Sequence, residues 1–445
     1  MPLLTATKVW ALVAAQSFGG PAGQIAVMQR VLVEDRRWIG QGRFLHALNY
    51  CTMLPGPEAQ QLATYVGWLL GGVRGGLVAG WLFVLPGAVA MFVLSAVYVA
   101  FGTTTIVAAL FAGIAPAVLA IVAQALIRLA RRALARRALV VLASAAFVAL
   151  AIFAVPFPVV VLAAAVLGWL TGRRRPGALT PSPAEDEQGP APLIHDDALH
   201  EEAPQLPLSA RVLALGVLAW AVPVALVVLV TGRDSTPSEE GLFFSGAALV
   251  TFGGAYAVLS YVAQRAVEDY GWLGPGEMVR GLALAETTPG PLIMVVQFVA
   301  FIGAYRNPGS LNPWVAATIG ALLTTWVTFV PSFTLVFLGA PYVERLRSNR
   351  TVADALAGVT AAVVGVIANL ALYFALHTLF GTVERLGWGP VRPEFPDLTT
   401  VRPVAVVIAV AAAMMLFRLR WPVLRTLGAC ALLGLAAAAL SLPIR

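Results

Sequence analysis

Residues 51–61 read CTMLPGPEAQQ, and they interrupt a long apolar region with two prolines, a glycine and an acid. A Pro-Gly-Pro step removes two backbone N–H donors, so a helix cannot continue through it. Almost the same triplet returns in TTPGPL at residues 287–292. The chain therefore contains the same helix-breaking step twice, each time inside apolar sequence.

The composition is typical of a polytopic membrane protein. Of the 445 residues, 59% are apolar and 11% are charged, whereas soluble domains carry about 25% charged residues. Apolar blocks near the length of a helical span, about 20 residues, fill most of the chain. A transmembrane barrel would instead show alternating segments of about ten residues. We expect an all-α polytopic membrane protein of about 13 transmembrane segments, in two homologous halves with broken helices.

Charge and cysteine usage exclude several other classes. The net charge is +7, but the arginines are scattered at the ends of apolar blocks, which is typical of topology signals and not of nucleic-acid binding. Cys51 and Cys430 form no CxxC pair, so we expect neither a disulfide framework nor a zinc site. GGVRGG at 71–76 lacks the Gly-Lys-Ser/Thr ending of a phosphate-binding loop. We expect no enzyme, no metal and no cofactor.

One polar stretch separates the two halves of the chain. Residues 173–208 are acidic and proline-rich, which predicts a solvated cytoplasmic linker. His195 and His200 lie among its acids, where a disordered tether is favoured over a weak metal site. The predicted divisions are a first repeat at 1–172, the linker at 173–208, an extra span with its loop at 209–240, and a second repeat at 241–445.

The two halves repeat each other. SFGGPAGQIAVM at 17–28 resembles TFGGAYAVLSYV at 251–262, an offset of 251 − 17 = 234 residues. Pro55 and Pro289 share this offset, and later matches follow at offsets of 236 and 245 because of small insertions. A fixed offset over such a length indicates internal duplication.

The extra span at 209–231 has no counterpart ahead of the first repeat. It therefore turns the second copy over, and the arginine clusters place the N-terminus in the cytoplasm. Inverted repeats are a recurrent design of secondary transporters, with the substrate near the membrane midplane where the repeats meet. The apolar blocks at 40–71 and 275–303 either cross the membrane or re-enter from one side.

Two kinds of helix break, Phe-Gly-Gly and Pro-Gly-Pro, recur in both halves. Irregular backbone survives in a membrane only inside protein or along a watery cavity. A helix that restarts at Glu58 or Leu292 has unpaired N–H groups and a positive dipole end, which suit an anion. Close helix packing is the alternative reading, but the duplication favours function. The predicted substrate-binding residues are Ser17, Phe18, Gly19, Gly20, Pro21, Pro55, Gly56, Pro57, Gln60, Gln61, Thr251, Phe252, Gly253, Gly254, Pro289, Gly290, Pro291 and Gln297.

Several polar residues are candidates for coupling or for a counter-charge. Glu58 either caps its helix or carries a proton. Glu286 is the acid nearest the second Pro-Gly-Pro, and it is not the repeat equivalent of Glu58. Arg30 and Arg265 either balance an anion or extend their charged ends to the interface. The remaining polar candidates are His46, Asn49 and Tyr65.

The motifs FGGPAGQIAVMQR, FLHALNYCTMLPGPEAQQLATYVGW, AGWLFVLPG, TFGGAYAVL and LAETTPGPLIMVVQFVAFIGAY resemble the chromate transporter family in its long, two-domain form. The resemblance covers nearly all of both halves. It implies export of chromate, a sulfate-like oxyanion, driven by the membrane potential or an ion gradient, and it places the substrate at the duplicated breaks. Where some members have His, this chain has Gln24.

Three functional hypotheses follow. The first is export of chromate across the bacterial inner membrane. The second keeps the transporter and changes the substrate to sulfate or another oxyanion, because a site of backbone N–H groups and amides barely separates the two. The third is an oxyanion-sensing membrane scaffold. The expected partners are the oxyanion and the lipid bilayer, without nucleic acid, and the sequence is compatible with a homodimer.

Overall fold

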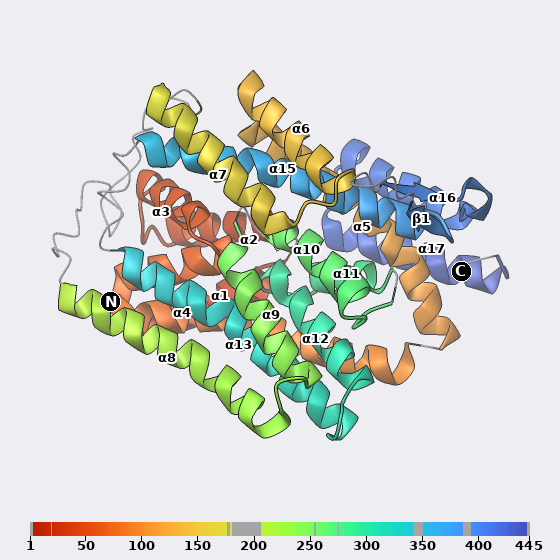
Figure 1. The fold of residues 1–445 in the computed structure, drawn as a ribbon, viewed down its shortest axis with the longest axis horizontal. Helices are drawn as coiled ribbons and strands as arrows, with labels where there is room; N and C mark the ends of the chain where they lie inside the picture. The colour runs from red at the N-terminus through yellow and green to blue at the C-terminus, as the bar shows by residue number, and fades with distance from the viewer. Residues whose placement is uncertain are drawn as a thin grey trace. The chain divides into compact units, whose positions relative to one another are not determined.

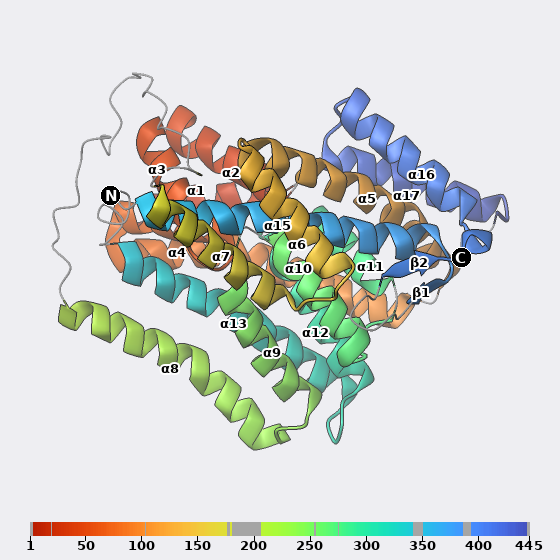
Figure 2. The same cartoon turned by 45° about the horizontal axis from the view of Figure 1, so that its top comes forward.

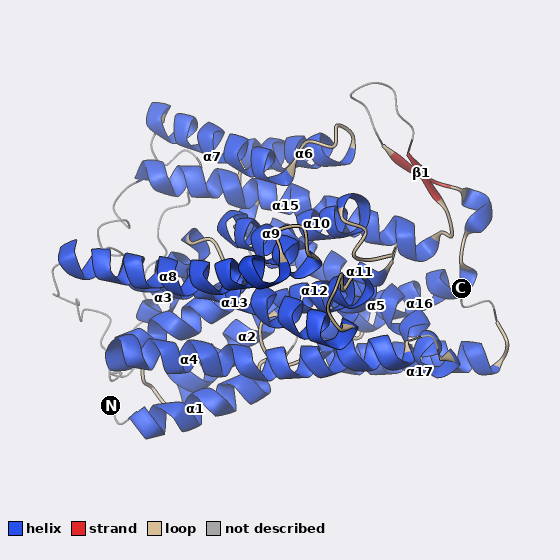
Figure 3. Cartoon of the chain, turned by 60° about the horizontal axis from the view of Figure 1, so that its bottom comes forward, coloured by secondary structure: helices blue, strands red, loops and turns tan. Residues whose placement is uncertain are grey.

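The computed structural model of the chain describes residues 3–18, 20–102, 104–175, 179, 206–252, 255–274, 276–340, 350–385 and 393–442. Within these ranges almost every element is a helix, as Figure 3 shows, apart from a short two-stranded hairpin. Six helices within the described ranges are long and apolar enough to cross a membrane. The all-α membrane fold expected from composition is therefore confirmed.

The chain folds into two compact units, each assembled from three stretches. Unit 1 comprises Met1–Phe92, Pro181–Val258 and Thr288–Asn349, and unit 2 comprises Val93–Thr180, Leu259–Thr287 and Arg350–Arg445. Each unit contains segments from both predicted repeats. The two units therefore do not coincide with the two repeats, whose boundaries stay a prediction.

Unit 1 holds the N-terminal helices and a bundle around α13, the helix that crosses the centre of this unit in Figure 1. Helices α8, α9 and α12 all pack on α13. The buried core includes Trp10, Phe44 and Leu62. The elements are α1 (Leu3–Gln16), α2 (Gly20–Gln29), the π-helix η1 (Arg30–Asp35), α3 (Gln41–Met53), most of α4 (Glu58–Phe101), α8 (Leu206–Thr231), α9 (Thr236–Val250), the 3₁₀-helix η3 (Leu292–Met294), α12 (Val295–Arg306) and α13 (Pro313–Gly339).

Helix α8 corresponds to the extra span expected at 209–231. Only 6% of its most apolar window is buried, and Leu229 and Val230 are about four-fifths exposed. A large exposed apolar surface is stable in lipid and unfavourable in water. This helix therefore has the surface of a lipid-facing membrane span.

Helix α4 contains a sharp reversal. Gly71 and Gly72 have non-helical backbone angles, and an added Cβ at Gly67 would lie 2.6 Å from the carbonyl oxygen of Gly75. Eight residues of straight helix would separate those glycines by about 12 Å. Residues 58–70 and 73–101 are therefore two arms folded against each other.

Neither helix beside the first Pro-Gly-Pro break can span a bilayer alone. Helix α3 has 13 residues, and it and the first arm of α4 are each about 20 Å long against a hydrocarbon core of about 30 Å. They pack as a hairpin, with the rings of Tyr50 and Tyr65 5.1 Å apart. For the block at 40–71, the helix lengths agree with the re-entrant alternative.

Unit 2 is built around α15 and α5. Helix α15 packs against α5, α6 and α7, and α16 and α17 pack against α5, as Figure 2 displays. Glycines permit close approach: a Cβ at Gly358 would lie 2.6 Å from the carbonyl oxygen of Ala164. The elements are α5 (Thr105–Ala133), α6 (Arg137–Ala151), α7 (Phe157–Arg174), most of α10 (Ala255–Gln264), the π-helix η2 (Arg265–Asp269), α11 (Glu277–Thr287), α15 (Arg350–Leu379), β1 (Val383–Arg385), β2 (Glu394–Pro396), the 3₁₀-helix η5 (Leu398–Thr400), α16 (Pro403–Ala413), the π-helix η6 (Met414–Arg418) and α17 (Val423–Ala439).

The two strands form an antiparallel hairpin between α15 and α16. Val383 pairs with Pro396 and Arg385 pairs with Glu394. Arg402, the residue that precedes α16, donates its backbone N–H to the carbonyl oxygen of Leu379 at 2.8 Å. This bond ties the start of α16 to the end of α15.

Candidate functional site

The structure contains the two Phe-Gly-Gly breaks. Helix α1 ends at Gln16 and α2 begins at Gly20, while α9 ends at Val250 and α10 begins at Ala255. Gly20 has φ of 71°, outside the helical region. Gly19, Gly253 and Gly254 lie outside the described residues.

The two Pro-Gly-Pro breaks are also present. Helix α3 ends at Met53 and α4 begins at Glu58, while α11 ends at Thr287 and η3 begins at Leu292, leading into α12. The predicted restarts at Glu58 and Leu292 are confirmed. Each restart leaves the first N–H groups of a helical segment without partners in that segment.

Each Pro-Gly-Pro break is hydrogen-bonded to the Phe-Gly-Gly break of the other half. The N–H of Gly56 donates to the carbonyl oxygen of Thr251 at 2.7 Å, and the N–H of Gly290 donates to that of Ser17 at 2.9 Å. Both pairs are related by the offset of 234 residues found in the sequence. Reciprocal contacts of this kind arise when two similar elements meet around a twofold axis. We call this arrangement the crossed breaks, and all four of its residues belong to unit 1.

The glycine at each Pro-Gly-Pro break is required by conformation and by space. Gly56 has φ of 125°, and an added Cβ would lie 2.0 Å from Oγ of Ser332 on α13. Gly290 has φ of 89°, and its Cβ would lie 3.0 Å from the carbonyl oxygen of Phe83 and 3.3 Å from Cα of Gly87 on α4. Positive φ is strained for residues with a side chain. Only glycine fits either position without rearrangement.

The facing positions Ser332 and Gly87 are themselves repeat equivalents, at the offset of 332 − 87 = 245. The rings of Trp81 and Trp326, which share this offset, stack with centroids 5.6 Å apart. Equivalent residues touch each other when they lie next to a twofold axis. The second arm of α4 and helix α13 therefore flank the axis of the crossed breaks.

Buried glutamines hold the backbone of the breaks. Gln24 donates its Nε2 to the carbonyl oxygen of Gly290 at 2.5 Å, and Gln61 donates to that of Pro55 at 2.7 Å. Gln60 donates to Oγ1 of Thr64 at 2.9 Å. The Oε1 atoms of all three are buried and unpartnered among the residues that the structure describes. In this conformation the amide groups of Gln24 and Gln61 hold the backbone of the breaks, whereas that of Gln60 bonds within its own helix.

Gln24 also marks a difference between the two crossings. Its repeat equivalent, at an offset of 234, is Val258, which cannot donate a side-chain hydrogen bond. An amide side chain therefore holds the carbonyl oxygen of Gly290. At the equivalent position for the first break, Val258 offers no such donor. Sequence reasoning noted Gln24 as a replacement for His, but gave it no structural role.

The other predicted break residues are mostly buried. Ser17 and Thr251 are at most 1% exposed, and their hydroxyls donate to Val13 and Ala247 one turn earlier. Pro57, Pro291 and Gln297 are buried, and Phe18, Pro21, Pro55, Phe252 and Pro289 are half-buried. The crossed breaks are thus largely closed to solvent.

The charged candidates occupy several separate places. Glu58 is half-buried in the first turn of α4. Arg30 is exposed and donates to Oε1 of Gln16 at 2.7 Å. Arg265 forms an ion pair with Asp269 and lies over the ring of Tyr270 at 5.4 Å. Glu286 is buried in α11.

Arg265 and Glu286 belong to unit 2, whereas the crossed breaks belong to unit 1. Among the remaining candidates, Tyr65 is buried and stacks on Trp68 at 5.9 Å. His46 is half-buried in α3. Asn49 lies in the same helix, and the position of its side chain is outside the description, as are His195 and His200 of the linker.

A buried acid in unit 1 escaped sequence reasoning. Glu240 on α9 is fully buried. Its Oε2 occupies the space left by the absent side chain of Gly320 on α13, 2.2 Å from where a Cβ would lie. The predicted division at 209–240 placed Glu240 in the loop after the extra span, where burial was not expected. Within the described part of the chain, no cluster of three or more His, Cys, Asp or Glu residues is placed to hold a metal.

Comparison with known proteins gives one consistent family. The family model described as chromate transporter matches residues 4–169 and 239–435. A chromate transport protein from Pseudomonas aeruginosa is 33% identical over 358 residues, which cover 79% of this chain and 76% of that protein.

Two further relatives are more distant. A probable chromate transport protein from Synechococcus elongatus is 26% identical over 92% of this chain and 94% of its own length. A chromate transport protein from Cupriavidus metallidurans is 26% identical over 81% of this chain and 80% of its own. No solved structure matches the chain.

Proposed function

Because the chain belongs to the chromate transporter family, we propose that it carries chromate across the membrane through a site at the crossed breaks. The observation that carries this proposal is the reciprocal pair of hydrogen bonds, Gly56 to Thr251 and Gly290 to Ser17. It joins the Pro-Gly-Pro break of each half to the Phe-Gly-Gly break of the other half within one unit. Helix N-termini favour anions, and glycines allow a ligand to approach the backbone.

The same bonds suit alternating access. A secondary transporter opens to each side in turn by moving one repeat against the other around a fixed site. A hydrogen bond that joins the two repeats at the site must be exchanged during that movement. A chromate oxygen is an acceptor, so it can take the N–H of Gly56 or Gly290 in place of the carbonyl oxygen.

We further propose that transport is outward, across the bacterial inner membrane, with the N-terminus in the cytoplasm and the two repeats inverted. The membrane potential is sufficient to favour this direction. One elementary charge crossing 100 mV corresponds to about 2.3 kcal/mol, so export of a dianion from a negative interior gains about 4.6 kcal/mol. This drive requires neither ATP nor enzymatic activity.

Chromate retention in cells tests the proposal. Cells of a chromate-sensitive bacterium expressing the chain should retain less radiolabelled chromate than cells with an empty vector. Gly290→Leu should restore full retention while the protein remains in the membrane fraction. Retention equal to that of the empty vector in cells with the unchanged chain would overturn the proposal.

Two alternatives remain to be separated by experiment. In inverted membrane vesicles, sulfate that competes with chromate at equal concentration would indicate a general oxyanion transporter. Deleting linker residues 180–204 should leave transport unchanged, whereas a sensing scaffold that signals through this acidic segment would lose its output.

A further inference from the structure

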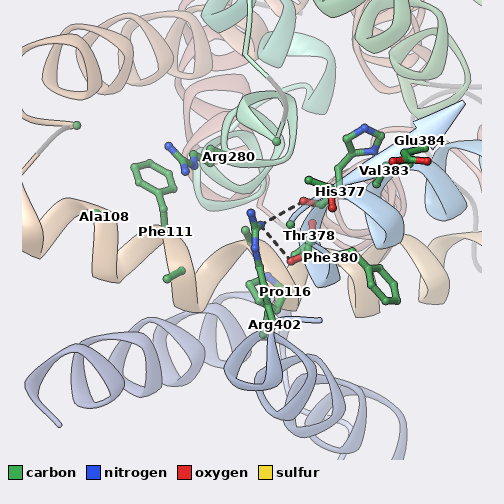
Figure 4. A pocket seen from close by; sticks show the side chains of 17 residues that line it. Ala108, Phe111, Pro116, Arg280, His377, Thr378, Phe380, Val383, Glu384 and Arg402 are labelled. Carbon is green, nitrogen blue, oxygen red and sulfur yellow. Dashed lines mark hydrogen bonds between the residues drawn. The ribbon is translucent and has the colours of Figure 1, made fainter. Parts of the chain in front are cut away.

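Unit 2 contains a cavity of about 700 Å³ that none of the predicted site residues lines. It lies where the end of α15 and the start of α16 face α5 and α11. Figure 4 shows the side chains of Arg280 and Arg402 directed into it, with Phe111 and Pro116 of α5 on one wall. We call this cavity the arginine pocket.

The guanidinium group of Arg402 makes weak contacts to backbone carbonyls and retains N–H donors for a ligand. Its Nη1 makes long contacts of 3.4 and 3.5 Å to the carbonyl oxygens of His377 and Thr378, drawn as dashed lines in Figure 4. Its Nε is buried and has no hydrogen-bond partner within the described ranges. A guanidinium group offers five N–H donors in a planar fork, so most of its donors are uncommitted.

Arg280 presents a second cation to the same space. Its Nη1 donates to the hydroxyl oxygen of Tyr98 at 3.1 Å, and that hydroxyl donates to Oε1 of Glu277 at 2.7 Å. In the described part of the chain, neither Arg280 nor Arg402 forms a salt bridge with a carboxylate. Two arginines that line one cavity without carboxylate partners are suited to bind an oxyanion through charge-assisted hydrogen bonds.

The rest of the lining agrees with an anionic ligand. Nδ1 of His377 donates to the carbonyl oxygen of Tyr373 at 2.9 Å, so this N–H is used within the fold and the donors for a ligand are those of the two arginines. The acid that lines the pocket is Glu384, which is exposed and which Figure 4 places beside His377, away from Arg280. The charged lining side chains thus have a positive balance.

We propose that the arginine pocket is a second oxyanion site, which binds a tetrahedral dianion between Arg280 and Arg402. The proposal rests on the proposed function for the choice of chromate as the physiological ligand, but the pocket's chemistry requires only a compact dianion. The crossed breaks offer neutral donors for passage, whereas two guanidinium groups suit capture of the anion from solution.

Equilibrium binding of radiolabelled sulfate to the purified full-length protein in detergent tests this site without requiring transport. At low ionic strength we expect two classes of site. Arg402→Gln and Arg280→Gln should each lower the affinity of one class by about 10- to 100-fold, the value of one charge-assisted contact. Glu384→Gln should raise the affinity of that class, and Arg211→Gln, an exposed arginine on α8, is the matched control.

Gly290→Leu separates this proposal from the proposed function. It should remove the other class of site and leave the arginine class intact. Arg402→Lys, which keeps the charge, should bind more tightly than Arg402→Gln and so guards against a folding defect. Binding by the double variant Arg280→Gln/Arg402→Gln with wild-type affinity and stoichiometry would overturn the proposal, whatever the export assay shows.

Discussion

Substituting Gly56 by alanine tests the geometry of the crossed breaks most sharply. The new Cβ would lie 2.0 Å from Oγ of Ser332 and 2.7 Å from Nε2 of Gln61. Overpacking of this kind costs about 1–3 kcal/mol, and holding alanine at φ of 125° costs a further 1–3 kcal/mol or so. We therefore expect Gly56→Ala to lower the free energy of unfolding from this conformation by roughly 2–6 kcal/mol.

The two contributions can be separated. Ser332→Gly, which copies the glycine found at the equivalent position 87, removes the nearest clash but not the backbone strain. Gly56→Ala/Ser332→Gly should therefore recover about half of the loss. Gly246 on α9 has open space around its Cβ position, so Gly246→Ala is the matched control and should be neutral or slightly stabilising.

Two quantities are measured: the thermal stability of the purified protein in detergent, monitored by size-exclusion chromatography, and the initial rate of chromate export. Gly56→Ala should have a lower thermal stability and a lower export rate than Gly246→Ala. Equal stability and equal export in these two variants would refute the crossed geometry, because neither the strain nor the contact with Ser332 would then exist.

Three further predictions concern side chains around the breaks. Gln24→Leu should destabilise the protein by about 1–3 kcal/mol, because it leaves the buried carbonyl oxygen of Gly290 without its amide donor. Thermal stability equal to wild type would contradict this role of the Gln24 hydrogen bond. Gly320→Ala should reduce thermal stability, because its new Cβ meets the Glu240 carboxyl. The double variant Gly320→Ala/Glu240→Ala should regain that stability. Additive losses in this double-mutant cycle would disprove the contact. Glu58→Gln should abolish the pH dependence of export if Glu58 carries a proton, and an unchanged pH profile would identify it as a helix cap.

The sequence predicted the positions of the breaks because their causes are local. Proline removes a donor and glycine permits positive φ wherever they occur, so the restart at Glu58 could be located directly. The offset of 234 residues also pairs Gly56 with Gly290 in the sequence alone. The prediction of a helical membrane protein followed equally directly from composition.

The contacts between the breaks could not be predicted. No local rule indicates that Gly56 donates to Thr251, because this bond depends on how two distant repeats meet. The hydrogen bond of Gln24 and the burial of Glu240 beside Gly320 also depend on helix packing. Arg280 and Arg402 lie far apart in the sequence, and only the fold brings them to one cavity.

The position of bound oxyanion tests the central claim most directly. Selenate is a tetrahedral dianion like chromate, and its selenium gives an anomalous X-ray signal that marks its position in a crystal. The account predicts an anomalous peak beside the N–H groups of Gly56 or Gly290, and loss of that peak in Gly290→Leu. Selenate bound only at places remote from both breaks would contradict it.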